Sequence, residues 1–400
     1  MPANSTATLG ALSAETFDAF AAGRQEPAWL AAARREAWAA FEAAGNPDWR
    51  RTNLKGLKLD TLSPAEPEVT VEFAGHQGVV VLPLAEALAS HGELVKRVLG
   101  SGIASGRDRF AALNNALVSG GVFVYVPRNT EVEAPVTISY RLTQAGAIAA
   151  PRTLVLVEAN SRIGIVEQYA SDQLDGQALL LPGTEIVVGD NSLVRYASVQ
   201  IVDSQVYVIG AQQFGLDGKD ARGEWLNVVL GGAVQNLKLD AQMRGNGSAI
   251  EWNGVLYGNK KQNLLVAPTL NHVGLNTEGQ INFKTVVDDE SYCVFDGMVR
   301  IPKTGQGTNS DLRENAMHLS KASRSDSIPG LEIDANEVKA GHGSTSGQID
   351  EEQLFYLQSR GLPFAEAKRI IVQGFVGEII DRIPDETLRE QVEELVAAKV

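Results

Sequence analysis

The fold depends on one stretch of sequence, Asn160-Ser161-Arg162-Ile163-Gly164-Ile165-Val166-Glu167, and on its partial repeat, Asn191-Ser192-Leu193-Val194-Arg195-Tyr196. Each stretch begins with an Asn-Ser pair, which is typical of a turn, and continues into apolar residues that favour a strand. An internal echo of this kind is typical of repeat folds, in which successive coils stack on one another. The echo therefore favours a β-helix with parallel rungs, in which one or more coils lie between the two copies.

The rest of the central region has the same texture. Between residues 120 and 301, short runs rich in Val, Ile, Leu and Thr alternate with Gly, Asn and Asp, as strands separated by tight turns require. No long amphipathic helix separates the runs, which excludes the βαβ pattern of a doubly wound sheet. The clearest runs are residues 122–126, 136–138, 153–157, 185–188, 204–209, 225–230 and 264–266. A β-sandwich or barrel accommodates them as well as a β-helix does, and the residues alone leave both architectures open.

Both ends of the chain have a helical composition. Ser13 is expected to cap the first helix, and Asp350 and Asp385 are expected to cap helices near the C-terminus. Residues 62–68 contain two prolines and are expected to be a linker. The sequence therefore predicts an N-terminal helical region at 1–62, a transition segment with short helices at 63–119, a β-helix core at 120–345 and a C-terminal helical region at 346–400.

Charge and hydropathy exclude several classes of partner. The 400 residues carry a formal net charge of −14, which disfavours binding to nucleic acid or to an anionic membrane. No window offers the ~20 apolar residues that a membrane-spanning helix needs. The N-terminus lacks the basic segment and apolar run of a secretory signal. We therefore expect a soluble, cytoplasmic protein with no nucleic-acid or membrane partner.

The chain carries few candidates for chemistry. Cys293 is the only cysteine and lies in an apolar run, so we expect a small buried hydrophobe; a lone cysteine excludes an internal disulfide and an all-cysteine metal site. The five histidines show no ligand spacing, and the motifs of P-loop, serine-hydrolase and zinc enzymes are absent. Asp240 and the run at 288–290 supply carboxylates that a carbohydrate-active β-helix enzyme could use, although such runs are typical of solvated turns.

A longer segment, residues 304–375, carries a resemblance. It contains Thr304-Gly305-Gln306-Gly307-Thr308-Asn309, then Asn336-Glu337-Val338-Lys339-Ala340-Gly341-His342-Gly343-Ser344-Thr345, and then Leu354-Phe355-Tyr356-Leu357-Gln358-Ser359-Arg360-Gly361. This order resembles the signature of the SufB/SufD family, the paired scaffold subunits of SUF iron–sulfur cluster assembly. Weaker matches at residues 49–54, 113–124, 134–136, 272–277 and 283–284 extend the likeness over most of the chain.

The resemblance implies a mainly β fold: a right-handed parallel β-helix core flanked by N-terminal and C-terminal helical regions. It also implies a non-catalytic scaffold subunit of the SUF complex, with a SufB-like subunit and a SufC-like ABC ATPase as partners. The chain looks most like the SufD branch, because SufB-type chains carry a cysteine after the position of Cys293 and this chain has none. The alternatives are a SufB-like scaffold that forms a homodimer in isolation, and the carbohydrate-active enzyme.

The resemblance also points to site residues. His342 matches a family histidine that faces the SufB partner, which implies an iron or iron–sulfur ligand; Ala340 replaces a common family cysteine, so this chain supplies no thiolate there. No cofactor is expected to bind stably to this chain alone, only a transient cluster at the interface with SufB. The ATPase-binding residues are expected to be Leu354, Phe355, Tyr356, Leu357 and Arg360, with the aliphatic side chains buried and a polar side, including Arg360, exposed.

Overall fold

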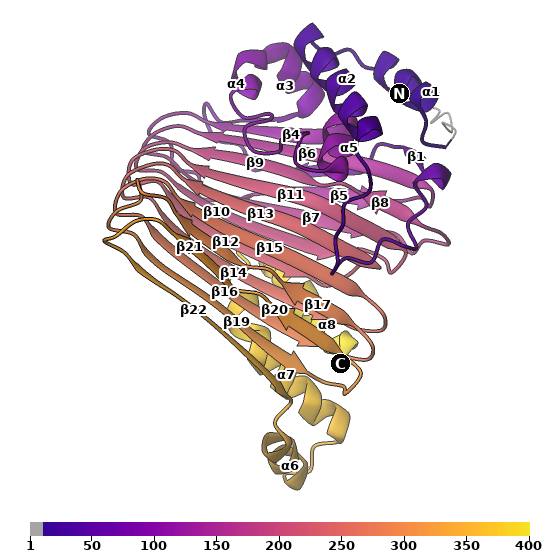
Figure 1. The fold of residues 1–400 in the computed structure, drawn as a ribbon, viewed down its shortest axis with the longest axis vertical. Helices are drawn as coiled ribbons and strands as arrows, with labels where there is room; N and C mark the ends of the chain where they lie inside the picture. Colours follow the sequence, from indigo (N-terminus) through magenta and orange to yellow (C-terminus); the bar gives the residue numbers. More distant parts are fainter. Residues whose placement is uncertain (1–10) are drawn as a thin grey trace.

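The computed structural model describes residues 11–400, which form a central parallel β-solenoid with helices at both ends (Figure 1). The chain alternates between two sheets, A and B, and completes about eight turns. Apart from β2 and β3, which pair antiparallel at the N-terminal edges of the two sheets, neighbouring strands are parallel and lie one full turn apart in the sequence. This arrangement decides between the two architectures that the sequence left open, and it confirms the predicted fold class.

Sheet B consists of eight parallel strands and one antiparallel strand, β2 (Glu68–Glu72), which pairs with β5 at the N-terminal edge. The parallel strands are β5 (Val136–Leu142), β7 (Arg162–Ser171), β10 (Leu193–Ile201), β12 (Arg222–Val229), β14 (Ala249–Gly258), β16 (Glu278–Val287), β19 (Asn309–His318) and β22 (Lys339–Gln348). Each of these strands except β22, the last one, is paired with the strand of the next turn.

Sheet A contains the remaining strands, and in three turns its strand is split into two short pieces. Its strands are β1 (Ser63–Pro64), β3 (Val80–Pro83), β4 (Val118–Val126), β6 (Ala147–Val157), β8 (Ala178–Leu180), β9 (Gly183–Val188), β11 (Val206–Leu216), β13 (Val234–Met243), β15 (Asn263–His272), β17 (Tyr292–Phe295), β18 (Met298–Ile301), β20 (Arg324–Ser327) and β21 (Gly330–Ile333). The predicted linker at 62–68 is therefore wrong in part, because β1 pairs with β6.

The sequence echo marks one corner of the solenoid. Asn129, Asn160 and Asn191 each have a positive φ of 52° to 59°, a conformation that asparagine tolerates better than most residues. Their side chains form a ladder: Asn191 Nδ2 donates to Asn160 Oδ1 at 3.1 Å, and Asn160 Nδ2 donates to Asn129 Oδ1 at 3.0 Å. The two quoted stretches therefore lie on consecutive turns, with their strands β7 and β10 in direct register.

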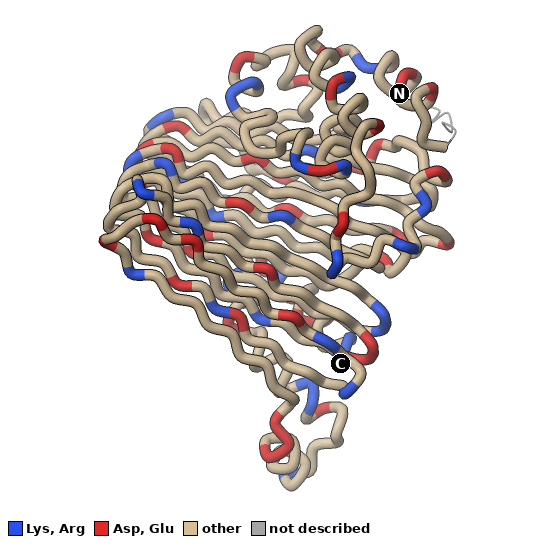
Figure 2. The backbone as a smooth tube through the Cα atoms, viewed as in Figure 1, with Lys and Arg blue, Asp and Glu red and all other residues tan. Residues whose placement is uncertain are grey.

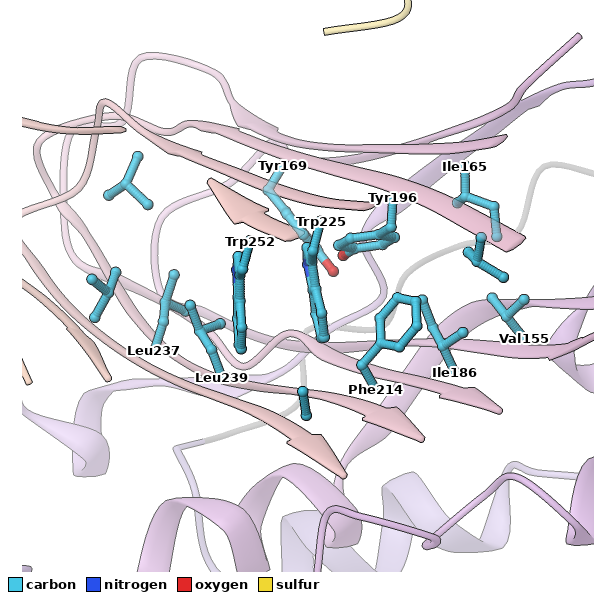
Figure 3. Close-up of a cluster of buried hydrophobic side chains, with 14 of the residues drawn as sticks. Val155, Ile165, Tyr169, Ile186, Tyr196, Phe214, Trp225, Leu237, Leu239 and Trp252 are labelled. Atoms are coloured by element: carbon cyan, nitrogen blue, oxygen red, sulfur yellow. The ribbon is translucent and has the colours of Figure 1, made fainter. Parts of the chain in front are cut away.

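The interior of the solenoid is filled by side chains from alternate positions of both sheets (Figure 3). Trp225 and Trp252 stack with their ring centroids 4.6 Å apart, and Tyr196 meets Trp225 edge-on at 5.4 Å. Both tryptophans are almost fully buried. Alternation along a strand sends every second residue to this core, which explains why the runs are rich in Val, Ile and Leu.

A polar network also runs through this interior. Oε2 of the fully buried Glu167 accepts hydrogen bonds from Tyr169 Oη at 3.0 Å, from Thr184 Oγ1 at 2.9 Å and from Tyr196 Oη. Burial raises the pKa of the Glu167 carboxyl, although the hydroxyl donors oppose this effect. The carboxyl is therefore held in an apolar core by side-chain hydroxyls, which limits the cost of burying it.

The N-terminal helices cover the outer face of sheet A at the N-terminal end of the solenoid (Figure 1). They are α1 (Ala14–Ala22), α2 (Ala28–Ala43), α3 (Leu84–Ser90), α4 (Gly92–Lys96) and α5 (Arg109–Ala116), with a short 3-10 turn at Leu59–Thr61. Ser13 caps α1 as predicted, through a reciprocal capping box with Thr16. Arg152 of β6 and Glu185 of β9 form a fully buried ion pair, with Nη1 2.7 Å from Oε1. Glu185 also accepts a hydrogen bond from Gly100 N and Arg152 donates one to Asn115, so the pair joins the helical layer to sheet A.

The C-terminal helices α6 (Glu351–Ser359), α7 (Phe364–Ile380) and α8 (Glu386–Lys399) begin at the predicted caps Asp350 and Asp385 and at Pro363. Apolar residues of α7 and α8 pack on the outer face of sheet B. Asp288, expected to lie in a solvated turn, is instead 8% exposed and pairs with Lys368 of α7 at 2.7 Å. Among residues 11–400, no helix is long and apolar enough to cross a membrane.

Candidate functional site at the open end of the solenoid

The two ends of the solenoid differ. At the N-terminal end, Phe73, Val79 and Val81 from the segment around β2 and β3 pack against the first turns of the core. At the C-terminal end, the last strand of sheet B, β22, pairs with β19 on one side, and within the described part of the chain no strand pairs with its other side. Eight of its ten residues are exposed. An exposed strand edge with free backbone groups is a template for pairing with another chain.

His342 lies in the middle of this free strand. The register pairs it with Leu312 of β19, which is fully buried in the core, so both side chains are on the lumen side of sheet B. His342 is nevertheless exposed, because no further turn covers it. Ala340 pairs with Ser310 and packs partly against the core. The predicted ligand thus stands at the rim of the lumen; its role as a ligand stays a prediction.

A second histidine, His318, lies at the same end. Its Nε2 is 2.8 Å from Ser325 Oγ and 3.1 Å from Ser346 Oγ, and its Nδ1 is 3.2 Å from Ser323 Oγ. Burial lowers the pKa of the imidazole, so it is neutral at physiological pH. These serines link β19, β20 and β22, and they make the mouth of the lumen polar. Sequence reasoning did not find this cluster, because its members are spread over residues 318–346.

A second buried carboxylate lies near this end. Glu314 of β19 is 2% exposed and faces the lumen beside Leu312, as Glu167 does in an earlier turn. Burial raises the pKa of the Glu314 carboxyl, and the nearby hydroxyls of Thr285 and Ser327 oppose this effect. The only available signal in the sequence was a carboxylate at a strand position where alternation calls for an apolar residue.

Cys293 does not belong to this mouth. It is fully buried in the core, one turn deeper than Ser325, with which it pairs in register. Burial raises the pKa of its thiol to about 12, so the thiolate that would attack or bind a metal is essentially absent at neutral pH. The expectation of a small buried hydrophobe is confirmed. Within residues 11–400, no three His, Cys, Asp or Glu side chains are grouped closely enough to hold a metal ion.

Helix α6 projects beyond the solenoid at this end (Figure 1). Leu354 is 6% exposed and Leu357 is half-buried, as expected for the aliphatic side. The exposed side carries polar and charged residues including Arg360, as expected, but it also carries Phe355, which is 73% exposed, and Tyr356, which is 56% exposed. Arg360 is exposed and stacks over the Tyr356 ring, with Cζ 5.2 Å from the ring centroid. We call Phe355, Tyr356 and Arg360 the α6 surface.

The α6 surface continues into a groove of about 730 Å³ between α6, α7 and the end of β22. Tyr356, Ile370 and Phe375 are among the residues that line it. Phe364 and Ile370 of α7 are also exposed, at 57% and 40%. Charged residues lie beside this apolar groove, because α6 begins with the acidic residues Glu351 and Glu352. Along the solenoid, by contrast, acidic and basic residues are interspersed in the view of Figure 2. Exposed apolar residues gathered in this way are typical of an interaction surface.

Comparison with known proteins agrees with this architecture. The family model for the SUF system FeS cluster assembly SufBD core domain matches residues 140–375, and the model for the SufBD N-terminal region matches residues 65–138. The chain is 28% identical to the iron–sulfur cluster assembly protein SufD of Bacillus subtilis over 84% of this chain and 77% of the relative. It is 25% identical to a SufBD family protein of Synechocystis, over 88% of this chain and 75% of that one. Because the core match alone spans more than half of the sequence, the chain belongs to the SufBD family of the SUF iron–sulfur cluster assembly system.

Proposed function

We propose that this chain is a SufD-like, non-catalytic scaffold subunit of the SUF complex in the cytoplasm. In this proposal, the open end of the solenoid pairs with a SufB-like subunit and the α6 surface binds a SufC-like ATPase. The observation that carries the proposal is the free strand β22, with His342 on its lumen side. Membership of the SufBD family and the similarity to a SufD protein support it.

Strand addition at β22 follows from its hydrogen bonds. Lys339 N donates to Thr308 O at 2.8 Å, and Ile349 N donates to His318 O at 3.0 Å. Because successive amides of a strand point to alternate sides, the odd-numbered residues from 339 to 349 bond to β19 and the even-numbered ones face the free edge. The amides of His342 and Ser344 are therefore available to a partner strand. In the absence of a SufB-like subunit, the same edge would pair with a second copy of this chain.

The nascent cluster is cargo in this scheme, and this chain contributes one ligand to it. A neutral imidazole at position 342 is a suitable iron ligand. The thiolates come from the SufB-like subunit, because Ala340 has no thiol and Cys293 is fully buried. The chain itself then holds the partner's site in place and performs no bond-making step.

The α6 surface has enough exposed area to anchor an ATPase. Phe355 is 73% exposed, and a phenylalanine side chain buries on the order of 200 Å² when fully covered. Covering the exposed part at ~25 cal/mol per Å² would contribute about 3 to 4 kcal/mol as an upper bound. Replacing Phe355 by Asp should therefore weaken ATPase binding by at least tenfold and change folding stability little, because the side chain makes few contacts within the chain.

The experiment is anaerobic co-purification of the tagged chain with SufB-like and SufC-like subunits. Two variants separate the two interfaces: Ser344→Pro removes one free-edge amide without removing a bond to β19, and Phe355→Asp alters the α6 surface. The matched controls are Ser344→Ala and Glu386→Gln, the second on the exposed first turn of α8. We expect Ser344→Pro to lose the SufB-like subunit alone and Phe355→Asp to lose the ATPase alone.

The proposal fails if the intact chain brings down neither subunit, or if both variants retain both subunits. Loss of both subunits from either variant would indicate misfolding, which circular dichroism and gel filtration of the variant alone would reveal. The iron-ligand role of His342 is tested separately by His342→Ala, which should retain both subunits and lower the iron and sulfide content of the reconstituted complex.

A further inference from the structure

Three buried polar atoms converge inside the last turns of the solenoid. They are Oε2 of Glu314 on β19, Oγ1 of Thr285 on β16 and Oγ of Ser327 on β20. Each atom is inaccessible to solvent, and no group in the described part of the chain completes a hydrogen bond to it. Buried polar atoms in native proteins are paired with very few exceptions, so three in one place call for an explanation.

The three residues face the same part of the lumen, which we call the Glu314 chamber. Glu314 pairs in register with Phe283, and Ser327 pairs with Phe295; both phenylalanines belong to the solenoid core, so these positions face the lumen. Thr285 is 1% exposed and lies two residues after Phe283 on the same face. The hydroxyls of Thr285 and Ser327 lie close enough to Glu314 to lower the pKa of its carboxyl, yet neither makes a hydrogen bond of regular geometry. The atoms are thus near one another without satisfying one another.

The chemistry of the chamber restricts what would occupy it. Water would satisfy the two hydroxyls but brings no positive charge, whereas a cation would satisfy their oxygens and also neutralise a buried carboxylate. The donor set consists only of oxygen atoms, one of them anionic. Mg²⁺ and Mn²⁺ prefer such oxygen ligands, and the borderline ion Fe²⁺ accepts carboxylate as well as imidazole ligands, whereas softer ions prefer nitrogen and sulfur.

We propose that Glu314, Thr285 and Ser327 form a weak site for a hard divalent cation just inside the open end of the solenoid, and that its cargo in the cell is Fe²⁺. This inference rests on the proposed function for the identity of the cargo, because iron is what SUF assembly consumes.

The position of the chamber fits a holding site for iron. In the register of β19 and β22, Glu314 lies opposite Ser344, and Leu312, two residues earlier, lies opposite His342. Glu314 is therefore a diagonal neighbour of His342, one turn deeper in the lumen. A cation held by Glu314 would lie beside the rim residue proposed to bind the cluster. With a single carboxylate the site would bind weakly, which suits an ion that must leave again.

The test uses the isolated full chain and Mn²⁺ alone as the probe. Electron paramagnetic resonance measures free Mn²⁺, whose signal decreases as the ion binds. We expect a saturable site with a dissociation constant of about 0.1 to 1 mM, the range of weak oxygen-ligand sites. Glu314→Gln should weaken binding at least tenfold. Glu278→Gln, which removes the same charge from an exposed position on β16, should leave it unchanged.

Several outcomes would overturn the inference. Absence of saturable binding to the intact chain would mean that the chamber holds only water. Equal weakening by Glu314→Gln and Glu278→Gln would mean that Mn²⁺ binds the acidic surface. If Glu314→Gln does not fold, Thr285→Val replaces it and should weaken binding several-fold. The titration requires no partner subunit, so its failure leaves the co-purification result intact, and failure of co-purification leaves the titration intact.

Discussion

The buried Arg152–Glu185 pair predicts how the N-terminal helices are attached to the solenoid. Both side chains are 0% exposed. Glu185 accepts hydrogen bonds from Gly100 N at 3.0 Å and Gly102 N at 2.9 Å, in the loop that precedes α5. Arg152 in turn donates to the side-chain oxygens of Asn114 and Asn115 on α5. Replacing Glu185 by Ala therefore removes the acceptor of the loop amides and leaves a buried guanidinium without its counter-charge.

The expected cost is large. Breaking a buried ion pair by removing one partner costs about 3 to 5 kcal/mol, because the remaining charge stays buried. The double variant Arg152→Leu/Glu185→Leu removes more groups, but it leaves no unpaired charge. Its remaining cost is that of the loop amides and of the Asn114 and Asn115 oxygens, which lose the Arg152 donor, at roughly 1 to 3 kcal/mol for each group that stays buried without a partner. Because the loop can turn its amides towards water, we expect the double variant to be less destabilised than Glu185→Ala.

Hydrogen exchange measures this prediction locally, which suits an elongated fold whose parts need not unfold together. Peptides covering residues 100–117 should exchange about a hundredfold or more faster in Glu185→Ala, because each 1.4 kcal/mol corresponds to tenfold. Peptides from β14 and β16 should be unchanged and provide the internal control. The reasoning is refuted if Glu185→Ala changes exchange less than fivefold, or if the double variant exchanges faster than the single one.

Three further predictions concern the interior. Burial lowers the pKa of His272 from 6.5 to about 4. The free energy of unfolding should therefore be highest above pH 6.5 and decrease by about 3 kcal/mol as pH falls from 6.5 to 4. In denaturant titrations His272→Gln should lack this decrease, and an equal decrease in the variant would contradict the prediction. The pKa of Glu167 is raised, which has the opposite effect: the free energy of unfolding decreases as pH rises above 4.5. The stability of Glu167→Gln relative to the wild type should therefore increase with pH. A difference in stability that is independent of pH would exclude this prediction. Trp252→Ala removes a fully buried ring stacked on Trp225 and should lower the free energy of unfolding by about 3 to 5 kcal/mol. Trp29→Ala, at a half-buried position, is the control in thermal unfolding. A loss below about 1 kcal/mol for Trp252→Ala, similar to that of the control, would show that the stack contributes little.

Local chemistry made much of the fold predictable. The Asn-Ser echo at residues 160 and 191 marks two consecutive corners because a positive φ selects asparagine. Ser13, Asp350 and Asp385 cap helices as expected, because each cap is satisfied by amides within three residues. What remained undecided was the choice between a sandwich and a β-helix. That choice concerns which strands pair, and strand composition is the same in both.

The candidate site was predictable only in part. The position of His342 followed from resemblance, but its exposure depends on its being on the last turn of the solenoid. The exposure of Phe355 and Tyr356 on α6 was not predicted, because the sequence does not show which apolar residues of a short helix the rest of the chain leaves uncovered. The His318 cluster and the Glu314 chamber escaped detection altogether.

The sequence by itself determined the elements of this protein: strands where β-branched residues alternate, corners at Asn and Gly, and helices between recognisable caps. Each of these depends on interactions within a few residues, so local order in the chain is sufficient. The tertiary structure alone decided what lies together at the open end. Thr285, Glu314 and Ser327 are separated by 13 to 42 residues, and they converge because stacked turns place residues about 30 positions apart directly above one another.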